Sequence, residues 1–417
     1  MPERPQEHHE YTAARELMEL MVATSQRPKE GNEAFVDTLA AYLETGSLDL
    51  ERVVDPEYPD RSLLVVHVGD PEAEQVLTTI SHGDVVGVEG QESWETDPWK
   101  LYEDGENWIG RGVCDTHGSG VSMLLAALRP EIQQRLHETK SRVSIVFTYD
   151  EEATTPEFSM RGARHAVGEF GTEPVVTSKY YIAGEPTEID GAPSVMRGHK
   201  GRWLAHFIVD VDRAGHVSDD VLNAFEEGSI KVEELKLWKY LLTLGSAEDE
   251  EAAIFNPPYT TAQVSAARVK QGDYSTTPSH AEFTVDMRTL PFVHDWRTLE
   301  ARDLFTKGPA GRPWPEGVHT RLVVEKDAAG SMTRPDSPIV LLSETISGQV
   351  ARGFNGGDEG RIMRAAGLEG VTIGPGKLAH AHMPNETIAI QSVLHMANVY
   401  GEFFMRASEL PRGGGNA

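Results

Sequence analysis

The sequence predicts an α/β fold in two parts: a mainly parallel, mixed sheet covered by helices, and an inserted α+β domain. In the first half of the chain, short apolar runs rich in β-branched residues alternate with helical patterns, which is typical of a parallel sheet with helices on both faces. The chain has 417 residues, and a single core rarely grows beyond about 300 residues, so two domains are expected.

The elements of the first part follow from the spacing of apolar residues. Helical spacing predicts two helices, over Tyr11–Ser25 and Phe35–Leu43. Short apolar runs predict strands at Leu63–Val68, Val76–Ile80, Val143–Tyr149 and Tyr180–Ala183. A further helix is expected over Val121–Leu136. Pro130 should end or kink that helix, because proline lacks a backbone N–H.

The pattern changes after Met196. The next residues predict strands at Trp203–Val211, Val264–Val269 and Ala281–Met287, and helices at Val221–Phe225 and Ile230–Leu242. We therefore expect an inserted domain at 197–330, and a first domain made of 1–196 and 331–417. The helix Ile339–Ala351 and the strand Val371–Ile373 resume the first pattern, and residues 412–417 should be disordered.

Composition excludes several kinds of partner. The formal net charge of −28, from 38 basic and 66 acidic residues, repels phosphate backbones, so no nucleic acid is expected. No run of eighteen apolar residues occurs, so no membrane span is expected. The single cysteine, Cys114, permits no internal disulfide, and the polar start of the chain has no signal-peptide core. Both observations favour a cytoplasmic location.

Five short segments carry acidic or imidazole side chains where apolar runs give way to loops. Ligands of parallel sheets bind beyond the carboxyl ends of the strands, so we expect these side chains to share one site. Two His, one Asp and two Glu make a ligand set that suits a pair of divalent cations. The predicted ligands are His82, Asp115, Glu152, Glu185 and His382.

The sequence around each predicted ligand suggests which of the two cations that ligand would bind. Cations about 3.5–4 Å apart repel strongly, so a carboxylate must bridge them, and Asp115 in its Gly-flanked loop is the predicted bridge. His82 and Glu185 would hold one ion, and Glu152 and His382 the other.

Two further acidic residues have predicted roles at this site. Asp84 would accept the second N–H of the His82 ring and so fix its orientation. Glu151 would hold the water that lies between the ions. Zinc is favoured, cobalt and manganese are alternatives, and a single occupied position is left open.

In order along the chain, these segments resemble those of the metallohydrolases that include acetylornithine deacetylase, succinyl-diaminopimelate desuccinylase, aminoacylase and carboxypeptidase G. The resemblance covers nearly the whole chain. It implies a metal-binding α/β catalytic domain, an inserted lid domain that forms a homodimer, the ligand assignments above, and Glu151 as general base. The matching pieces are Ser81–Val86, Gly110–Asp115, Glu151–Glu152, Gly184–Thr187, Gly374–Gly376 and Ala381–Glu386.

The resemblance extends into the insertion. The segment around His216 is similar to the family's lid segment, whose histidine reaches the partner subunit's site and stabilises an oxyanion; a loop histidine facing solvent is the alternative. The segment around Arg288 is similar to a lid strand whose arginine grips a substrate carboxylate, and a salt bridge with Asp286 is the alternative. Thr276 stands where the family often has an asparagine that binds substrate.

Three residues near the predicted ligands have open roles. Cys114 and His117 are interpreted as packing around the site, with metal ligation as the less favoured alternative. His380 is a second imidazole close to His382. The order Pro384-Asn385-Glu386 after His382 favours His382 as the ligand.

The predicted reaction is hydrolysis of a C–N bond, the amide of an N-acyl amino acid or small peptide that carries a carboxylate. A metal-bound hydroxide would attack, and Glu151 would take and return the proton. One alternative is hydrolytic deamination of an aromatic amine, because nitroanthranilate aminohydrolase resembles this family. Another is a non-catalytic protein that kept the metal site, which the presence of Glu151 disfavours. The glycine turns at 118–120 and 374–376 lack a phosphate-binding spacing, which excludes a nucleotide site.

Overall fold

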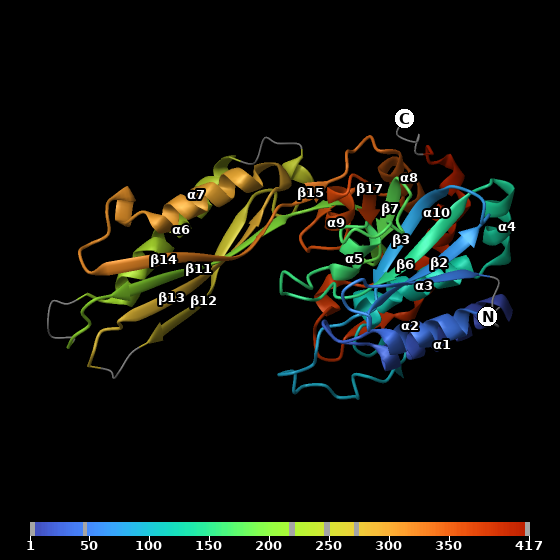
Figure 1. The fold of residues 1–417 in the computed structure, drawn as a ribbon, viewed down its shortest axis with the longest axis horizontal. Coiled ribbons are helices and arrows are strands. Elements are labelled where there is room, and N and C mark those ends of the chain that lie inside the picture. The colour runs from blue at the N-terminus through green and yellow to red at the C-terminus, as the bar shows by residue number, and fades with distance from the viewer. Residues whose placement is uncertain (1–4, 45–47, 217–221, 246–250, 271–274, 413–417) are drawn as a thin grey trace. The chain divides into compact units, whose positions relative to one another are not determined.

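The structure, a computed structural model, describes residues 5–44, 48–216, 222–245, 251–270 and 275–412 (Figure 1). The chain forms two compact units. Unit 2 comprises Gly198–Met332 and Gly353–Gly357, and unit 1 comprises Met1–Arg197, Thr333–Arg352 and Asp358–Ala417. The short return of the chain to unit 2 at Gly353–Gly357 is a feature that the sequence did not indicate. The disorder predicted for residues 412–417 is wrong for Arg412, whose guanidinium donates to the backbone carbonyls of Thr139 and Lys140. Residues 413–417 lie outside the described residues.

Unit 1 is built on a mixed β-sheet, and the predicted fold class is confirmed. The central strands β6, β3, β7 and β17 lie side by side and run parallel. At one margin β2 and β1 continue the sheet antiparallel, and at the other β10 pairs antiparallel with β17 through Met196. The strands are β1 Asp49–Val54, β2 Ser62–Gly69, β3 Gln75–His82, β6 Arg142–Thr148, β7 Tyr180–Ala183, β10 Met196–His199 and β17 Glu369–Thr372.

Helices cover both faces of this sheet. The helices α1, α2, α3, α4, α8 and α10 bury apolar side chains against one face in the largest core cluster, and α5 and α9 pack on the other. Their bounds are α1 Pro5–Thr24, α2 Glu33–Leu43, α3 Gly118–Ala127, α4 Pro130–Glu138, α5 Arg161–Ala166, α8 Pro338–Ser347, α9 Gly360–Ala365 and α10 Ile390–Met405. Shorter strands of unit 1 are β4 Tyr102–Asp104, β5 Asn107–Ile109, β8 Glu188–Ile189, β9 Ala192–Pro193 and β18 Thr387–Ala389, and β16 Arg352–Phe354 lies where the chain crosses between the units.

Pro130 separates two helices, as predicted, and one other predicted helix ends earlier than expected. The helix predicted over Val121–Leu136 is two helices, because α3 ends at Ala127 and Pro130 begins α4. Proline is well tolerated at the first helical position, where its missing N–H would have no partner in the helix. The helix α8 ends at Ser347, because Gly348 adopts a left-handed backbone with φ 67° and so terminates it before Ala351.

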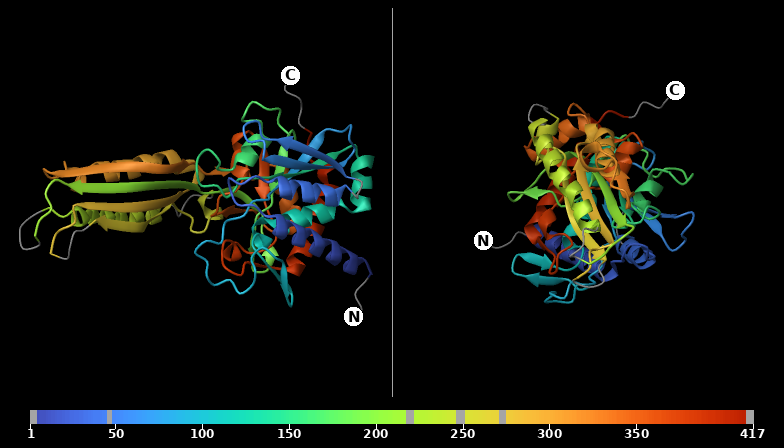
Figure 2. Two further views of the ribbon diagram at one scale, coloured as in Figure 1. Left: turned by 60° about the horizontal axis from the view of Figure 1, so that its bottom comes forward. Right: turned by 90° about the vertical axis from the view of Figure 1, so that its left-hand side faces the viewer.

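Unit 2 is a four-stranded antiparallel sheet in the order β12-β13-β11-β14. Alternate residues of β11, such as Trp203 and Phe207, are buried in one apolar cluster together with residues of α6 and α7. Figure 2 shows both helices on the same face of this sheet. The helix predicted at Ile230–Leu242 lies within α6. Of the helix predicted at Val221–Phe225, only Ala224 and Phe225 belong to α6, because Leu222 and Asn223 precede it and Val221 lies outside the described residues. The elements are β11 Gly201–Val211, α6 Ala224–Gly245, β12 Thr261–Lys270, β13 His280–Thr289, α7 His294–Thr306, β14 Val318–Ala328 and β15 Ser331–Met332.

None of the helices in the part of the chain that the structure describes combines the length and the apolar character needed to cross a bilayer.

Candidate metal centre

The predicted ligand residues meet at the carboxyl ends of the parallel strands of unit 1. His82 is the last residue of β3, Glu152 follows β6, and Glu185 follows β7. Because β3 pairs in parallel with both neighbours, these strand ends lie at the same edge of the sheet. Asp115 comes from the helical turn before α3, and His382 comes from the loop after β17.

The ligand atoms of these residues form three groups, in each of which they lie within 4.8 Å of one another. The groups are His82 with Asp115 and Glu185, Asp115 with Glu152 and His382, and His82 with Glu151 and Glu152. The first two groups are the two predicted metal positions, and Asp115 belongs to both. We call these six residues the acidic cluster.

Asp115 lies between the two imidazoles. Its Oδ1 is 3.1 Å from Nε2 of His82, and its Oδ2 is 3.1 Å from Nε2 of His382. Each carboxylate oxygen therefore faces a different ring nitrogen, which is the arrangement that a bridging ligand needs. Nε2 of His382 also lies 2.7 Å from Oε1 of Glu152, and Nε2 of His82 lies 3.9 Å from Oε1 of Glu185.

The acidic cluster fits a pair of cations by its charge. Among the described residues, no Lys or Arg nitrogen lies within 4.0 Å of any of its four carboxylates. Asp115 and Glu185 are only 7% and 6% exposed. Buried carboxylates without a counter-charge are costly, and divalent cations bound by imidazole nitrogen and carboxylate oxygen would supply that charge.

The two imidazoles hold protons strongly in the absence of such cations. Burial acts to lower the pKa of His82, but its hydrogen bond to Asp115 and that residue's charge outweigh burial and hold the pKa well above its usual range. Hydrogen bonds to Asp115 and Glu152 raise the pKa of His382 to about 10, although its side chain is 50% exposed. Both rings thus act as the positive partners of the carboxylates.

The carboxylates respond to burial in different ways. Burial, reinforced by the charge of Glu152, raises the pKa of Glu151 well above its usual range. Burial and the charge of Asp115 raise the pKa of Glu185 in the same sense. Burial also favours the neutral form of Asp115, but its hydrogen bonds with both imidazoles prevail and lower its pKa.

Asp84 makes contacts other than the one expected. The backbone carbonyl of Asp84, rather than its carboxylate, accepts a hydrogen bond from Nδ1 of His82 at 2.8 Å, and the nearer carboxylate oxygen is 3.9 Å away. The carboxylate instead accepts the backbone N–H groups of Glu151 and Glu152, each at 3.1 Å. The Asp84 side chain is buried and needs hydrogen-bond donors, and the turn after β6 supplies two backbone N–H groups. The carboxylate therefore binds that turn and not the His82 ring.

The turn that carries Glu151 is held from its other side by Asp150. Asp150 has a left-handed backbone with φ 57°, which aspartate tolerates better than most residues. Its carboxylate accepts the N–H of Lys29 at 2.6 Å and lies 3.0 Å from Nε of Arg61, a buried ion pair. Sequence reasoning assigned no role to Asp150 or Arg61.

The three residues with open roles do not enter the groups of ligand atoms found among the described residues. His117 is buried and contacts Ser25 Oγ through Nε2 at 2.7 Å; burial and the charge of His82 lower its pKa to about 3, so the ring is neutral. Cys114 donates its thiol to the Lys377 carbonyl. His380 contacts the Thr387 carbonyl through Nδ1.

Unit 2 holds the other predicted site residues. His216 is exposed and forms an isolated β-bridge with Thr276, so the structure brings these two together. Arg288 lies elsewhere on the same sheet, near the end of β13, where it pairs with Arg202 at the start of β11. Its Nε donates to Asp286 Oδ1 at 3.0 Å, which is the ion pair considered as the structural alternative.

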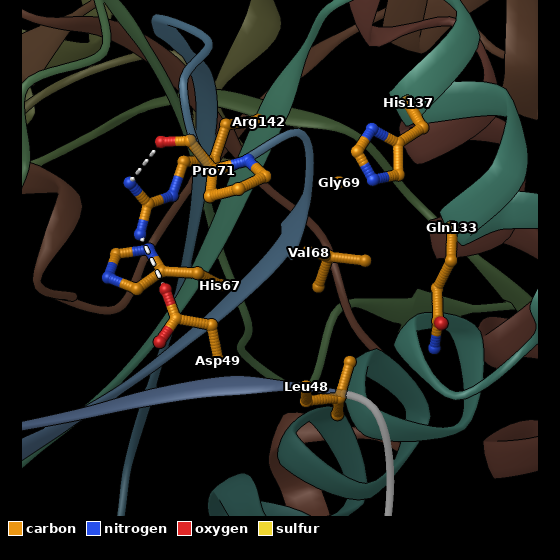
Figure 3. A pocket seen from close by; sticks show the side chains of 9 residues that line it. All are labelled: Leu48, Asp49, His67, Val68, Gly69, Pro71, Gln133, His137 and Arg142. Atoms are coloured by element: carbon orange, nitrogen blue, oxygen red, sulfur yellow. Dashed lines mark hydrogen bonds and ion pairs between the residues drawn. The ribbon is translucent and has the colours of Figure 1, made fainter.

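A separate hollow of about 320 Å³ lies at the opposite end of the unit 1 sheet, where β2 ends and β6 begins (Figure 3). Its charged groups already have partners, since the Arg142 guanidinium donates to Asp49 and to the Pro71 carbonyl. His67 there contacts Ser144 and Glu51. This hollow lacks the concentration of ligand atoms found at the acidic cluster.

Comparison with known proteins identifies the family. The sequence model of peptidase family M20/M25/M40 matches residues 78–406. The chain is 27% identical over 385 residues to an acetylornithine deacetylase of Myxococcus xanthus, covering 90% of this chain and 91% of that protein.

Solved structures agree in fold. A tripeptidase from Staphylococcus aureus has a TM-score of 0.73 at 16% identity, covering 96% of this chain and 99% of that one. A Bacillus subtilis protein described as a dinuclear metal binding peptidase has a TM-score of 0.67 at 12% identity, covering 96% and 98%. The resemblance inferred from the five segments is confirmed: the chain belongs to peptidase family M20/M25/M40 and is a metal-dependent hydrolase of carbon–nitrogen bonds.

Proposed function

We propose that this enzyme hydrolyses the amide bond of N-acyl amino acids or small peptides that carry a carboxylate. The observation that supports this most directly is that Asp115 is buried between two imidazoles, in an acidic cluster without a Lys or Arg counter-ion among the described residues. His82, Asp115 and Glu185 would hold one cation. Asp115, Glu152 and His382 would hold the other. The relatives named acetylornithine deacetylase support an N-acyl amino acid as substrate.

When bound, the cations would acidify a water molecule and polarise the scissile carbonyl. Glu151 would then act as the base: its carboxylate makes no hydrogen bond with other described residues, and Asp84 fixes its backbone N–H. Burial favours the protonated form of Glu151, which suits a group that must take a proton and later return it to the departing amine.

The unit 2 residues support a homodimer in which two chains complete one site. The strand β11 has 11 residues between the Arg288 end of the sheet and the His216 end, and at ~3.3 Å per residue it separates them by roughly 30 Å. One small substrate cannot contact both ends of one sheet. We therefore infer that His216 and Thr276 act on the site of the partner subunit, and that Arg288 binds the substrate carboxylate within its own chain.

The exposed faces of α6 and α7 suit such an association. Leu237 on α6 and Trp296 on α7 are 63% and 60% exposed, and Tyr240, Leu241 and Leu299 are exposed as well. Large apolar side chains exposed on neighbouring helices mark an interaction surface more often than a solvated one.

A release assay with metal analysis tests this proposal. The purified chain is stripped with chelator, reloaded with Zn²⁺, Co²⁺ or Mn²⁺, and offered N-acyl amino acids, dipeptides and an aromatic amine such as an anthranilate. Release of a primary amine from the first two classes, at two ions per chain, is the expected result. Ammonia release from the aromatic amine alone would favour the deaminase alternative, and no turnover with any metal would contradict an enzymatic role.

A further inference from the structure

Arg111 is a fully buried arginine on the segment that carries Asp115, and its guanidinium contacts Glu386, four residues after His382. Its Nη1 donates to Oε2 of Glu386 at 2.6 Å, and its Nη2 donates to Oε1 of Gln91. The ring of Trp94 lies 5.2 Å from the guanidinium carbon. A buried guanidinium is costly unless such partners surround it, so its contacts fix its position closely.

Glu386 connects Arg111 to the predicted bridging ligand. While Oε2 accepts from Arg111, Oε1 accepts the backbone N–H of Cys114 at 2.9 Å and that of Asp115 at 3.0 Å. One carboxylate therefore fixes the backbone from which the Asp115 side chain extends towards both imidazoles. Charge-assisted hydrogen bonds of this kind are stronger and more directional than neutral ones.

Gln91 connects Arg111 to the other predicted ligand. Its Nε2 donates to the backbone carbonyl of His382 at 2.9 Å. Its Oε1 accepts from both Arg111 and the indole N–H of Trp94, so the amide has only one orientation that satisfies all three neighbours. His382 has a left-handed backbone, with φ 62°, and a half-exposed ring, so this contact is a main anchor of its segment.

We propose that Gln91, Arg111 and Glu386, here called the Arg111 clamp, set the spacing between Asp115 and His382. The clamp thereby sets the metal affinity of the position formed by Asp115, Glu152 and His382, and through Asp115 it also affects the position that includes His82 and Glu185. The three are positioning residues. Arginine suits the centre because its planar guanidinium directs two separate terminal nitrogens to two acceptors, whereas lysine offers one compact ammonium without that fixed geometry. The inference rests on the proposed function, since it assumes that the acidic cluster binds metal.

The clamp could instead serve stability alone, and the chain offers a matched control for that alternative. Arg161 and Asp55 form another buried ion pair in unit 1, with hydrogen bonds of 2.7 and 2.9 Å. Neither residue belongs to the acidic cluster or bonds to a member of it. Breaking this pair should lower stability as much as breaking the Arg111 pair.

The test measures Zn²⁺ affinity directly on the full-length chain, by competition with a chromophoric chelator, together with thermal stability. The variants are Glu386→Gln, Arg111→Lys, Gln91→Ala and the control Asp55→Asn. Loss of a group that orients a metal ligand typically weakens binding about 10–100-fold. We expect Glu386→Gln to weaken both positions, because Asp115 serves both. Gln91→Ala should weaken only the position that contains His382. Asp55→Asn should lose stability and keep wild-type affinity.

The outcomes separate this inference from the proposed function. If the wild type binds two Zn²⁺ and all clamp variants bind them equally well while losing stability like Asp55→Asn, the clamp is structural and the inference is overturned. If Glu386→Gln does not fold, Gln91→Ala alone decides, because Gln91 is partly exposed and its loss leaves the buried ion pair intact. A wild type that takes up no Zn²⁺ would overturn the proposed function and this inference with it.

Discussion

The two units carry their predicted site residues in opposite ways. In unit 1, residues from five distant segments meet around Asp115, in groups whose ligand atoms lie within 4.8 Å of one another. In unit 2, the predicted residues lie at two ends of one sheet, with His216 beside Thr276 and Arg288 a strand length away. A site that is complete in one chain requires that chain's own site residues to lie close together. Residues that lie apart in one chain can share a site only if two chains supply it.

The largest effect should come from unit 1. Replacing Glu151 by Gln keeps the shape of the side chain but removes the base, so kcat should fall about 10²–10⁴-fold while the metal content stays at the wild-type value. Steady-state kinetics and elemental analysis on the same sample measure both. The control is Glu173→Gln, an exposed carboxylate of the same unit, which should change neither. Retention of more than a tenth of the activity by Glu151→Gln would assign the base elsewhere.

His216→Ala tests whether unit 2 acts across the dimer. Loss of one oxyanion donor should lower kcat about 10²–10³-fold. Mixing this variant with Glu151→Gln should restore activity, because each mixed dimer has one site with both groups intact. With random exchange of chains in a twofold dimer, about a quarter of the wild-type rate should return. An unchanged rate after exchange would place His216 in its own chain's site or outside catalysis.

Arg288→Met should have a smaller effect and the opposite behaviour on mixing. Loss of a charge-assisted hydrogen bond to substrate should raise KM roughly 10–100-fold. Mixing with Glu151→Gln should restore nothing, because Arg288 and Glu151 would serve the same site. Arg202→Met is the matched control, since Arg202 also pairs with Asp286, at 2.7 Å. Equal KM values for the two variants would mean that Arg288 acts only through that ion pair.

The smallest functional effect is expected at Asp55, which lies outside both sets of site residues. Burial acts to raise the pKa of Asp55, but hydrogen bonds from Arg161 and Tyr149 outweigh it and lower the pKa to about 2 from an ordinary 3.8. Because the folded-state pKa is depressed, this stabilisation is fully present above about pH 4 and is lost as the pH falls towards 2.

The Asp55→Asn variant measures this contribution. Its free energy of unfolding in urea should lie about 2–3 kcal/mol below the wild type near neutral pH, and the difference should shrink below about pH 4. Its kcat should be unchanged. A difference that grows on acidification would contradict the assigned direction of the pKa shift.

Much of the acidic cluster could be predicted from sequence, because the ligands other than His382 lie at or just after the end of an apolar strand or at the start of a helix. The strand ends at His82 and Ala183 are marked by composition, and parallel pairing brings them to one edge. Of the residues that position the ligands, the sequence suggested Asp84 but not the Arg111 clamp. Gln91, Arg111 and Glu386 act through contacts between segments nearly three hundred residues apart, which no local pattern records.

The same limit applies to parts of the fold. The strand β14 alternates between half-buried and exposed residues, and α7 exposes Trp296 and Leu299 while burying Thr298 and Ala301, so neither carries a clear apolar pattern. Their positions are decided by neighbours in unit 2. Asp84 is an example within the site. Its carboxylate binds the turn after β6, so its backbone carbonyl, and not its side chain, becomes the partner of His82, and the local sequence does not record that contact.

The order of the segments along the chain has a consequence for how the protein is made. Unit 2 interrupts unit 1, so its strands leave the ribosome before β17 and α10 do. Until then β7 lacks the neighbour that covers it, and an open strand edge of a nascent chain is a place where aggregation starts. Synthesis that stalls within the inserted unit would therefore leave a half-built sheet, with His382 still to be added to the cluster.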